Sequence, residues 1–303
     1  MFTCASVTAC SVAWIACLAS VSARPNIVGW DDNVAYASLA GGMHFDRTPG
    51  NLEVSDFGLH MQLPTAISLA ENLTLQPAFD YQSTILRFNQ VPTSIPVDRN
   101  NLETFSVYPS VLETSALLIV SREDSPWMFG AWTRTGVATD FRDMSGDDFN
   151  CDIAGGFGYR YDDKVSLGMG AAVTHLTGDA AFYPGLGLDW QISEQFRIGV
   201  CGPTLAATYT PDKNWQFAIR GDSTGEIWNI SDGDGKSRYI DFKSYRIGFF
   251  GSRRIWGEIL ITAGVGVTLG NEIGLNQSNG DVLIKQRLDS GLFSQVGLTI
   301  ASW

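Results

Sequence analysis

The sequence predicts an all-β protein that forms a single antiparallel transmembrane β-barrel of about 12 strands, within a range of roughly 10 to 14. Three observations support this prediction. Apolar residues alternate with small or polar residues at a period of two, and the alternating segments are long. Beyond residue 23, no apolar run approaches the ~18 residues that a membrane-spanning helix needs.

The alternation is clearest between residues 164 and 202. Val165, Leu167 and Met169 fall on one face of an extended chain, whereas Ser166 and Gly168 fall on the other. A helix would distribute these apolar side chains around its circumference, so this region is predicted as strands. The apolar face must then meet either a second sheet, as in a soluble sandwich, or lipid, as in a transmembrane barrel.

Strand length separates these two alternatives. Most of the predicted strands have about 8 to 13 residues, whereas a tilted transmembrane strand needs ~9–11 and strands of soluble domains centre on ~5–6. Short turns also alternate with longer polar connections, such as 89–103 and 221–236, as in outer-membrane barrels. The barrel is therefore preferred, and a secreted soluble β-sandwich or jelly roll with a binding function is the alternative.

The strand patterns follow one another from residue 33 to the carboxyl end. Turn residues such as Asp162-Asp163 separate them, and residues 228–236 are predicted as a polar loop. The stretches with a strand pattern are 33–45, 57–63, 73–81, 105–120, 127–141, 148–161, 165–174, 182–192, 196–201, 204–209, 215–219, 239–251, 258–270, 282–288 and 292–303.

Residues 1–23 are predicted as a signal peptide and residues 24–303 as the barrel. Residues 2–23 carry no charge and end in Val21-Ser22-Ala23, a small-x-small site that a signal peptidase could cut. Basic residues, which a signal usually carries at its start, are missing. A membrane-anchoring helix and a lipoprotein site at Cys17 are therefore the alternatives. Because the chain is predicted to be exported and to form a transmembrane barrel, we expect it to lie in the bacterial outer membrane.

The composition argues against two further features. The net charge is −12 and no cluster of Lys and Arg is present, so nucleic acid is not expected as a partner. Cys151 and Cys201 have opposite parities in their strand patterns, so their side chains are expected on opposite faces and no disulfide is predicted.

No convergent catalytic or metal-binding set is recognised, so the protein is predicted not to be an enzyme and to need no cofactor. Ser166 and His175 have opposite parities on one strand and cannot act together as nucleophile and base. Asp232-Gly233-Asp234-Gly235 resembles the start of a calcium loop, but Lys243 stands where the bidentate Glu would be.

Charged side chains in the strands share one parity, which is expected to face the lumen because a charge on the lipid face would cost ~2–4 kcal/mol near the midplane. They either line a conducting pore or pair across the interior and close it. In a pore, the four arginines of the set would favour anions. The predicted lumen residues are His60, Asp80, Asp152, Arg160, Asp189, Arg197, Arg220 and Arg246.

Five tryptophans are expected near the membrane–water interfaces, because the amphipathic indole ring is most favourable at that level. They are Trp127, Trp132, Trp190, Trp215 and Trp256.

Several short patterns recur between Trp127 and the carboxyl end at Trp303. They are a Trp-led strand that runs into Asp140-Phe141, then Tyr183-Pro184-Gly185-Leu186-Gly187-Leu188, Gly202-Pro203, Asp241-Phe242-Lys243-Ser244-Tyr245-Arg246 and Gly264-Val265-Gly266-Val267. In these patterns the sequence resembles a bacterial outer-membrane β-barrel family of unknown function. The resemblance implies a barrel fold and an outer-membrane location, and it implies no activity or substrate.

The expected function is therefore that of a passive pore or of a structural, surface-exposed barrel without catalytic activity. The expected partners are outer-membrane lipid and, during biogenesis, the barrel-assembly machinery. In the pore case small solutes would pass through the lumen.

Overall fold

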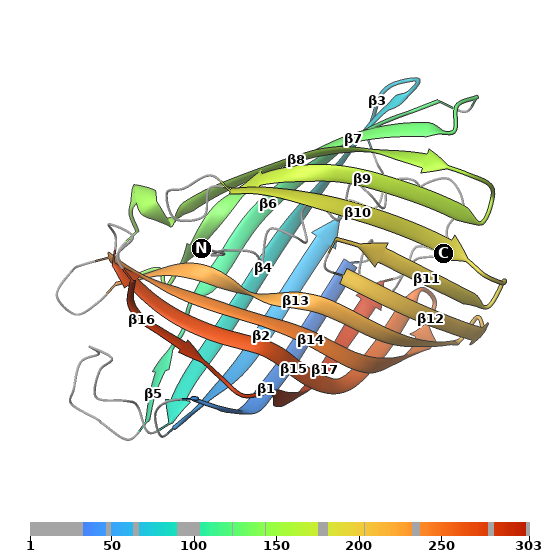
Figure 1. Ribbon diagram of the computed structural model, residues 1–303. Coiled ribbons are helices and arrows are strands. Elements are labelled where there is room, and N and C mark those ends of the chain that lie inside the picture. Colours follow the sequence, from blue (N-terminus) through green and yellow to red (C-terminus); the bar gives the residue numbers. More distant parts are fainter. Residues whose placement is uncertain are drawn as a thin grey trace.

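The computed structural model forms one closed β-barrel (Figure 1). The predicted signal peptide, His175, the segment 232–235 and Trp303 lie outside the residues that the structure describes. Among the described residues, no helix has the length and apolar character needed to cross a membrane. The described residues are 33–46, 50–62, 67–89, 104–122, 124–142, 144–174, 181–202, 204–231, 237–277 and 282–300.

The described residues form strand segments and one short 3-10 helix, η2 (Gly146–Asp148). The strand segments are β1 (Asn33–His44), β2 (Asn51–Gln62), β3 (Ile67–Ala70), β4 (Leu73–Asn89), β5 (Thr104–Val107), β6 (Ser110–Ser121), β7 (Trp127–Thr139), β8 (Phe149–Arg160), β9 (Val165–Thr174), β10 (Ala181–Gln191), β11 (Phe196–Cys201), β12 (Thr204–Asp212), β13 (Trp215–Ser231), β14 (Ser237–Trp256), β15 (Ile259–Gln277), β16 (Val282–Arg287) and β17 (Gly291–Ile300).

These segments make a closed antiparallel wall of 14 strands. Three pairs of segments act as single interrupted strands, because β2 and β3 both pair with β4, β5 and β6 also both pair with β4, and β16 and β17 both pair with β15. Pairing of β1 with β17, from Asn33 with Ile300 to Gly41 with Leu292, closes the ring. The all-β antiparallel barrel is confirmed, with somewhat more strands than the expected 12. The sandwich alternative is wrong, because a sandwich would leave two separate sheets.

The outer face of this wall is apolar on most of its strands. Residues that alternate outward along each strand are large and exposed, whereas their neighbours point inward and are smaller or polar. The exposed outer side chains include Leu39, Phe57, Leu112, Phe129, Ile153, Met169, Leu186, Leu205, Ile219, Phe249, Val265 and Leu298.

The interior holds two apolar clusters. The larger one fills the end of the barrel that carries the connections after β1, β4, β7, β13 and β15, and we call it the plug. Trp228, Met43 and Leu86 are among its fully buried side chains. The smaller cluster lies against β6 to β10 and contains Trp132 and Met128, with Tyr183 packed against it.

The strands between β10 and β13 are shorter than their neighbours. β11 pairs with β10 only from Gly187 to Gln191, and β12 pairs with β13 only as far as Gly221. β13 continues to Ser231, and its far end meets β7 in a parallel bridge between Asn229 and Thr139. Figure 1 shows β11 and β12 covering only the right-hand part of the wall between β10 and β13.

The predictions of a polar connection at 221–236 and of a polar loop at 228–236 are wrong for residues 221–231. These residues belong to β13, which pairs with β14 along its whole length. Residues 226–229 are all buried, because β7 and η2 cover the side of β13 that faces away from β14. A strand covered in this way shows no alternation of apolar and polar residues, so its sequence does not look like a strand.

Candidate functional site

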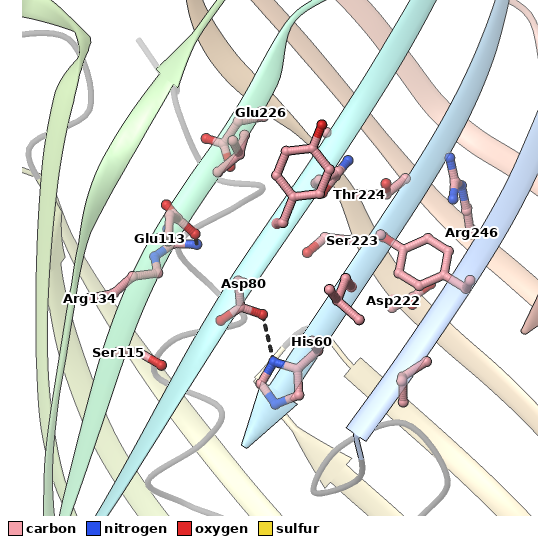
Figure 2. A pocket seen from close by; sticks show the side chains of 18 of the residues that line it. His60, Asp80, Glu113, Ser115, Arg134, Asp222, Ser223, Thr224, Glu226 and Arg246 are labelled. Carbon is pink, nitrogen blue, oxygen red and sulfur yellow. Dashed lines mark hydrogen bonds and ion pairs between the residues drawn. The ribbon is translucent and has the colours of Figure 1, made fainter. Parts of the chain in front are cut away.

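A cavity of about 330 Å³ lies inside the barrel, next to the plug. Val111 contributes both to the cavity wall and to the plug. Figure 2 shows side chains from separate strands around this space. The ionisable or aromatic side chains that line it are Tyr36, His60, Asp80, Tyr81, Glu113, Trp132, Arg134, Arg220, Asp222, Glu226 and Arg246.

His60 and Asp80 form a pair at the wall of the cavity. They are direct cross-strand partners on β2 and β4, and both point inward. His60 Nδ1 lies 2.6 Å from Asp80 Oδ1, as the dashed line in Figure 2 marks. Strand register therefore holds this pair together, because directly opposite residues in an antiparallel sheet have neighbouring side chains.

Arg134 on β7 lies between two carboxylates. Its Nη1 donates to Glu113 Oε2 at 3.0 Å, and its Nε donates to Asp152 Oδ2 at 3.0 Å. Asn150 also donates to Glu113, from Nδ2 to Oε1 at 3.1 Å. Both carboxylates are almost fully buried, and a buried charge requires such partners to offset its lost hydration.

Arg246 on β14 joins the cavity to a second buried network. Its Nη2 donates to Asp56 Oδ2 at 2.8 Å and its Nη1 donates to Ser38 Oγ at 3.2 Å. Ser38 and Thr84 donate their hydroxyl protons to the same Asp56 carboxylate at 3.1 and 3.0 Å. Four strands are thereby linked through one carboxylate.

Arg220 also has a carboxylate beside it. It lies two residues from Asp222 on β13, and its Nη2 donates to Asp222 Oδ2 at 2.6 Å. Each of the three arginines in the cavity wall is therefore paired with carboxylate, and the field of each guanidinium group is largely neutralised.

Glu226 is the exception among the acidic residues of the cavity. It is only 5% exposed, and one carboxylate oxygen, Oε1, accepts a hydrogen bond from the backbone N–H of Ile227 at 3.2 Å. Among the described residues, no Lys or Arg forms an ion pair with it. The backbone before it is unusual, since Gly225 has φ +117°, and an added Cβ would lie 2.1 Å from the carbonyl oxygen of Phe242.

The predicted lumen residues divide into two groups. His60, Asp80, Arg220 and Arg246 line the cavity, and Asp152 is buried behind Arg134. The other three lie elsewhere in the barrel. Asp189 and Arg197 bind each other, with Nε to Oδ1 at 2.5 Å, beside the turn between β10 and β11, whereas Arg160 Nη2 lies 4.0 Å from Met128 Sδ in the smaller apolar cluster.

The predicted tryptophans also divide. Trp127, Trp190, Trp215 and Trp256 have exposed side chains on the barrel surface, whereas Trp132 is only 7% exposed and lines the cavity. The interfacial position expected for Trp132 therefore does not hold. The physical reason is its spacing from Trp127: an odd number of residues along a strand places two side chains on opposite faces.

Sequence reasoning missed Glu113, Arg134, Asp222, Glu226 and the buried Asp56. Arg134 and Asp152 are direct cross-strand partners, so their pairing could have been found once the register of β7 and β8 was known. For Glu226 no such signal exists, because the strand that carries it was taken as a polar connection.

The cavity was also compared with the residue groups that bind metal ions. Among the described residues, no group of three or more His, Cys, Asp or Glu could hold a metal ion. Cys151 is exposed and Cys201 is buried, and neither takes part in a disulfide with another described residue.

Comparisons with solved structures find proteins of similar fold but low sequence identity. The COG4313 outer membrane channel from Pseudomonas putida F1 is 11% identical, with a TM-score of 0.42, over 91% of this chain and 100% of that chain. The P. putida toluene transporter TodX is 9% identical, with a TM-score of 0.41, over 94% and 92% of the two chains. A Pseudomonas aeruginosa FadL homologue is 12% identical, with a TM-score of 0.33, over 89% and 75%.

No curated protein matches the chain. The sequence profile of a family described as a domain of unknown function (DUF6268) matches residues 121–300. This range agrees with the resemblance expected from the patterns between Trp127 and Trp303. The chain therefore belongs to the DUF6268 family of unknown function.

Proposed function

We propose that the protein is a non-catalytic barrel of the bacterial outer membrane, and that its lumen is closed to the free passage of ions in the conformation described above. The observation that carries this proposal is the distribution of polarity: the outer face is apolar around the ring, and the charged side chains of the cavity are inside and, apart from Glu226, paired.

The apolar outer face supports a lipid environment. Exposed side chains such as Leu186, Val265 and Phe249 lie on strands all around the barrel, and together they form a far larger apolar surface than a water-soluble monomer exposes. Closed strands leave no unpaired sheet edge at most positions, which is the condition for placing a sheet in lipid. Outer-membrane lipid is therefore the proposed partner in the mature state, and the barrel-assembly machinery during biogenesis.

The plug supports a closed lumen rather than an open pore. It fills one end of the barrel with packed apolar side chains such as Trp228, Phe242 and Leu275, and water does not occupy such a close-packed region. The charges also argue against the expected anion preference. The cavity wall carries four carboxylates and three guanidinium groups, and each of these arginines is already paired.

Heat-modifiable migration tests the membrane barrel. The purified protein should migrate faster on a detergent gel before boiling than after it, and it should float with liposomes in a density gradient. A chain that remains monomeric and soluble without detergent would contradict the proposal.

Planar-bilayer recording tests the closed lumen. We expect no steady conductance from the purified protein, because ions would have to cross the plug. A steady conductance with anion preference would instead support an open pore governed by Arg160, Arg197, Arg220 and Arg246, and one with cation preference would indicate a pore governed by the carboxylates.

A further inference from the structure

The cavity beside the plug contains hydrogen-bonding groups that the protein leaves unused. Within the described part of the chain, the hydroxyl groups of Tyr36, Ser115 and Thr224 and the amide group of Gln295 make no hydrogen bond. All four side chains line the cavity and are half-buried, so they are in contact with the cavity space. A polar group that loses water without gaining a partner costs free energy, so a ligand in this cavity must supply hydrogen-bond partners.

Tyr36 provides an aromatic surface at the cavity wall. It is the direct partner of Gly58 across β1 and β2. A Cβ atom added to Gly58 would lie 2.2 Å from Tyr36 Cε1 and 2.6 Å from its Oη, so the ring lies across the glycine, in the place that a side chain would otherwise take. The side of the ring that faces away from Gly58 borders the cavity, and Trp132 adds a second aromatic group to the wall. Both rings offer apolar contact area to a ligand.

The polar and aromatic groups converge on one part of the cavity, around Ser38. Ser38 lies two residues after Tyr36 on the same face of β1, and its direct partner on β17 is Gln295. Arg246, the direct partner of Asp222 across β14 and β13, donates from Nη1 to Ser38 Oγ at 3.2 Å. A ligand that lies against Tyr36 is therefore within reach of side chains from β17 and β13.

The charged side chains in this part of the wall already have electrostatic partners. Arg220 pairs with Asp222 at 2.6 Å, and Glu226, which has no ion pair among the described residues, interacts electrostatically with Arg134. An ion in the cavity would therefore gain little from these charges. A neutral hydroxyl group would still gain a bond, because Asp222 Oδ1 accepts no hydrogen bond from a described residue and a carboxylate oxygen can accept one.

These properties distinguish three classes of ligand. An apolar molecule would leave the free hydroxyl and amide groups without partners, and an ion would lose its hydration without meeting an uncompensated opposite charge. A neutral molecule with several hydroxyl groups and an apolar face avoids both costs, because each hydroxyl group can donate and accept. The volume of about 330 Å³ is at the lower end of the ~300–1,000 Å³ of small-molecule sites, which favours one or two sugar rings over a longer chain.

We propose that the cavity binds a neutral sugar of one or two rings. The C–H face of a sugar ring lies against Tyr36, and its hydroxyl groups form hydrogen bonds with Thr224, Gln295 and Asp222. This inference goes beyond the proposed closed barrel, and it does not depend on the membrane location, because the site is formed by the lumen wall alone.

Binding is tested on the full protein in detergent by saturation-transfer NMR. The probes are the methyl glycosides of glucose, galactose and mannose and the disaccharide cellobiose. We expect a saturable signal from at least one probe, strongest on the ring C–H groups that lie against Tyr36. No saturable signal from any of the four would overturn the proposal.

The polarity and charge of the ligand are tested by competition against the best of these probes. Glucosamine, glucuronate and cyclohexylmethanol keep a six-membered ring but carry a positive charge, a negative charge or a single hydroxyl group. We expect each of them to compete more weakly than the unlabelled neutral sugar. Stronger competition by glucosamine would show a cation site, by glucuronate an anion site and by cyclohexylmethanol an apolar site, and each of these results would overturn the neutral sugar.

The position of the sugar is tested with two substitutions of Tyr36. Tyr36→Leu removes the ring and should weaken binding about tenfold. Tyr36→Phe keeps the ring and loses only the hydroxyl group, so it should weaken binding about threefold. Tyr209→Leu, which removes an exposed tyrosine from the outer face of β12, is the control and should bind as the wild type does.

Thr224→Val is a second test, because it keeps the shape of the side chain and removes only the hydroxyl group. We expect about threefold weaker binding, since one hydrogen bond to the sugar is lost. Unchanged binding by Tyr36→Leu or Tyr36→Phe would overturn the role of Tyr36, and unchanged binding by Thr224→Val would overturn that of Thr224.

Heat-modifiable migration is measured first for each protein, so that only folded barrels are compared. A wild type that fails this test contradicts the barrel proposed above. A wild type that passes it and binds none of the sugars contradicts the sugar site alone.

Discussion

The wall of the barrel has two regions that differ in their longest strands and in the side chains they bury. We call β1–β7 and β13–β17 the long-strand region, because it contains the four longest strands: β4 and β13 with 17 residues each, β15 with 19 and β14 with 20. The short-strand region comprises β8–β12, in which β11 has 6 residues and β12 has 9. Every residue of the plug comes from the long-strand region, whereas β8, β9 and β10 contribute only Ala154, Ala172 and Tyr183 to the smaller cluster.

This difference indicates which part of the barrel contributes most to its stability. Long strands from several parts of the chain extend to one end of the barrel and bury large side chains there, so that end is packed like a protein core. The short strands β11 and β12 end before their neighbours do and bury fewer large side chains. We expect substitutions in the plug to affect stability more strongly than substitutions in the short-strand region.

The largest effect is expected from Trp228→Ala in the plug. Trp228 is 1% exposed, and removing a buried large aromatic side chain costs about 3–5 kcal/mol of unfolding free energy. Urea unfolding in detergent should show this loss, and bilayer recording should show conductance as the plug loosens. Trp190→Ala, on the exposed surface of β10, is the control and should cost far less. Equal losses in the two variants would mean that the plug is not the more stable region.

The next largest loss of stability is expected when a buried ion pair is broken, and the loss should differ between the two regions. Arg246→Gln leaves Asp56 buried without its guanidinium partner and should cost about 3 kcal/mol of unfolding free energy. Arg197→Gln, which breaks the more accessible pair with Asp189, should cost roughly 1 kcal/mol. A larger loss for Arg197→Gln in the same unfolding assay would reverse the comparison.

A smaller effect is expected from Gly225→Ala in β13. The positive φ and the short approach to the carbonyl oxygen of Phe242 do not admit a Cβ without a backbone shift, and such strain costs about 1–3 kcal/mol. Gly155→Ala on β8 is the matched control, since its added Cβ would meet only the carbonyl oxygen of Gly130, at 3.9 Å. The midpoint temperature of thermal unfolding should be lower for Gly225→Ala than for the wild type, and unchanged for Gly155→Ala.

The smallest effect is spectroscopic and concerns two tryptophans of β7. Trp127 is exposed on the outer face and Trp132 lies in the cavity wall. Replacing Trp127 with Phe should reduce the fluorescence quenching caused by brominated lipids, whereas replacing Trp132 with Phe should leave that quenching almost unchanged. Strong quenching of Trp132 by lipid would instead show that lipid reaches the cavity wall.

The sequence was sufficient to predict the fold class and the facing of most strands. Alternation along a strand is a local property, so Val165, Leu167 and Met169 could be assigned to one face without knowledge of any neighbouring strand. The same parity argument would have placed Trp132 inside had it been applied to the spacing from Trp127. The inward position of His60 and Asp80 follows from the same reasoning.

The register and the ends of the strands could be determined only from the three-dimensional structure. Asp56 and Arg246 lie 190 residues apart in the chain, and no local pattern predicts that they meet. The sequence does not show which face of its strand carries Glu226. Residues around it show no alternation, because β7 covers the far end of β13 on the side away from β14. Alternation depends on the chain alone, whereas pairing depends on where every other strand begins and ends, so the cavity and the plug could be located only in the closed barrel.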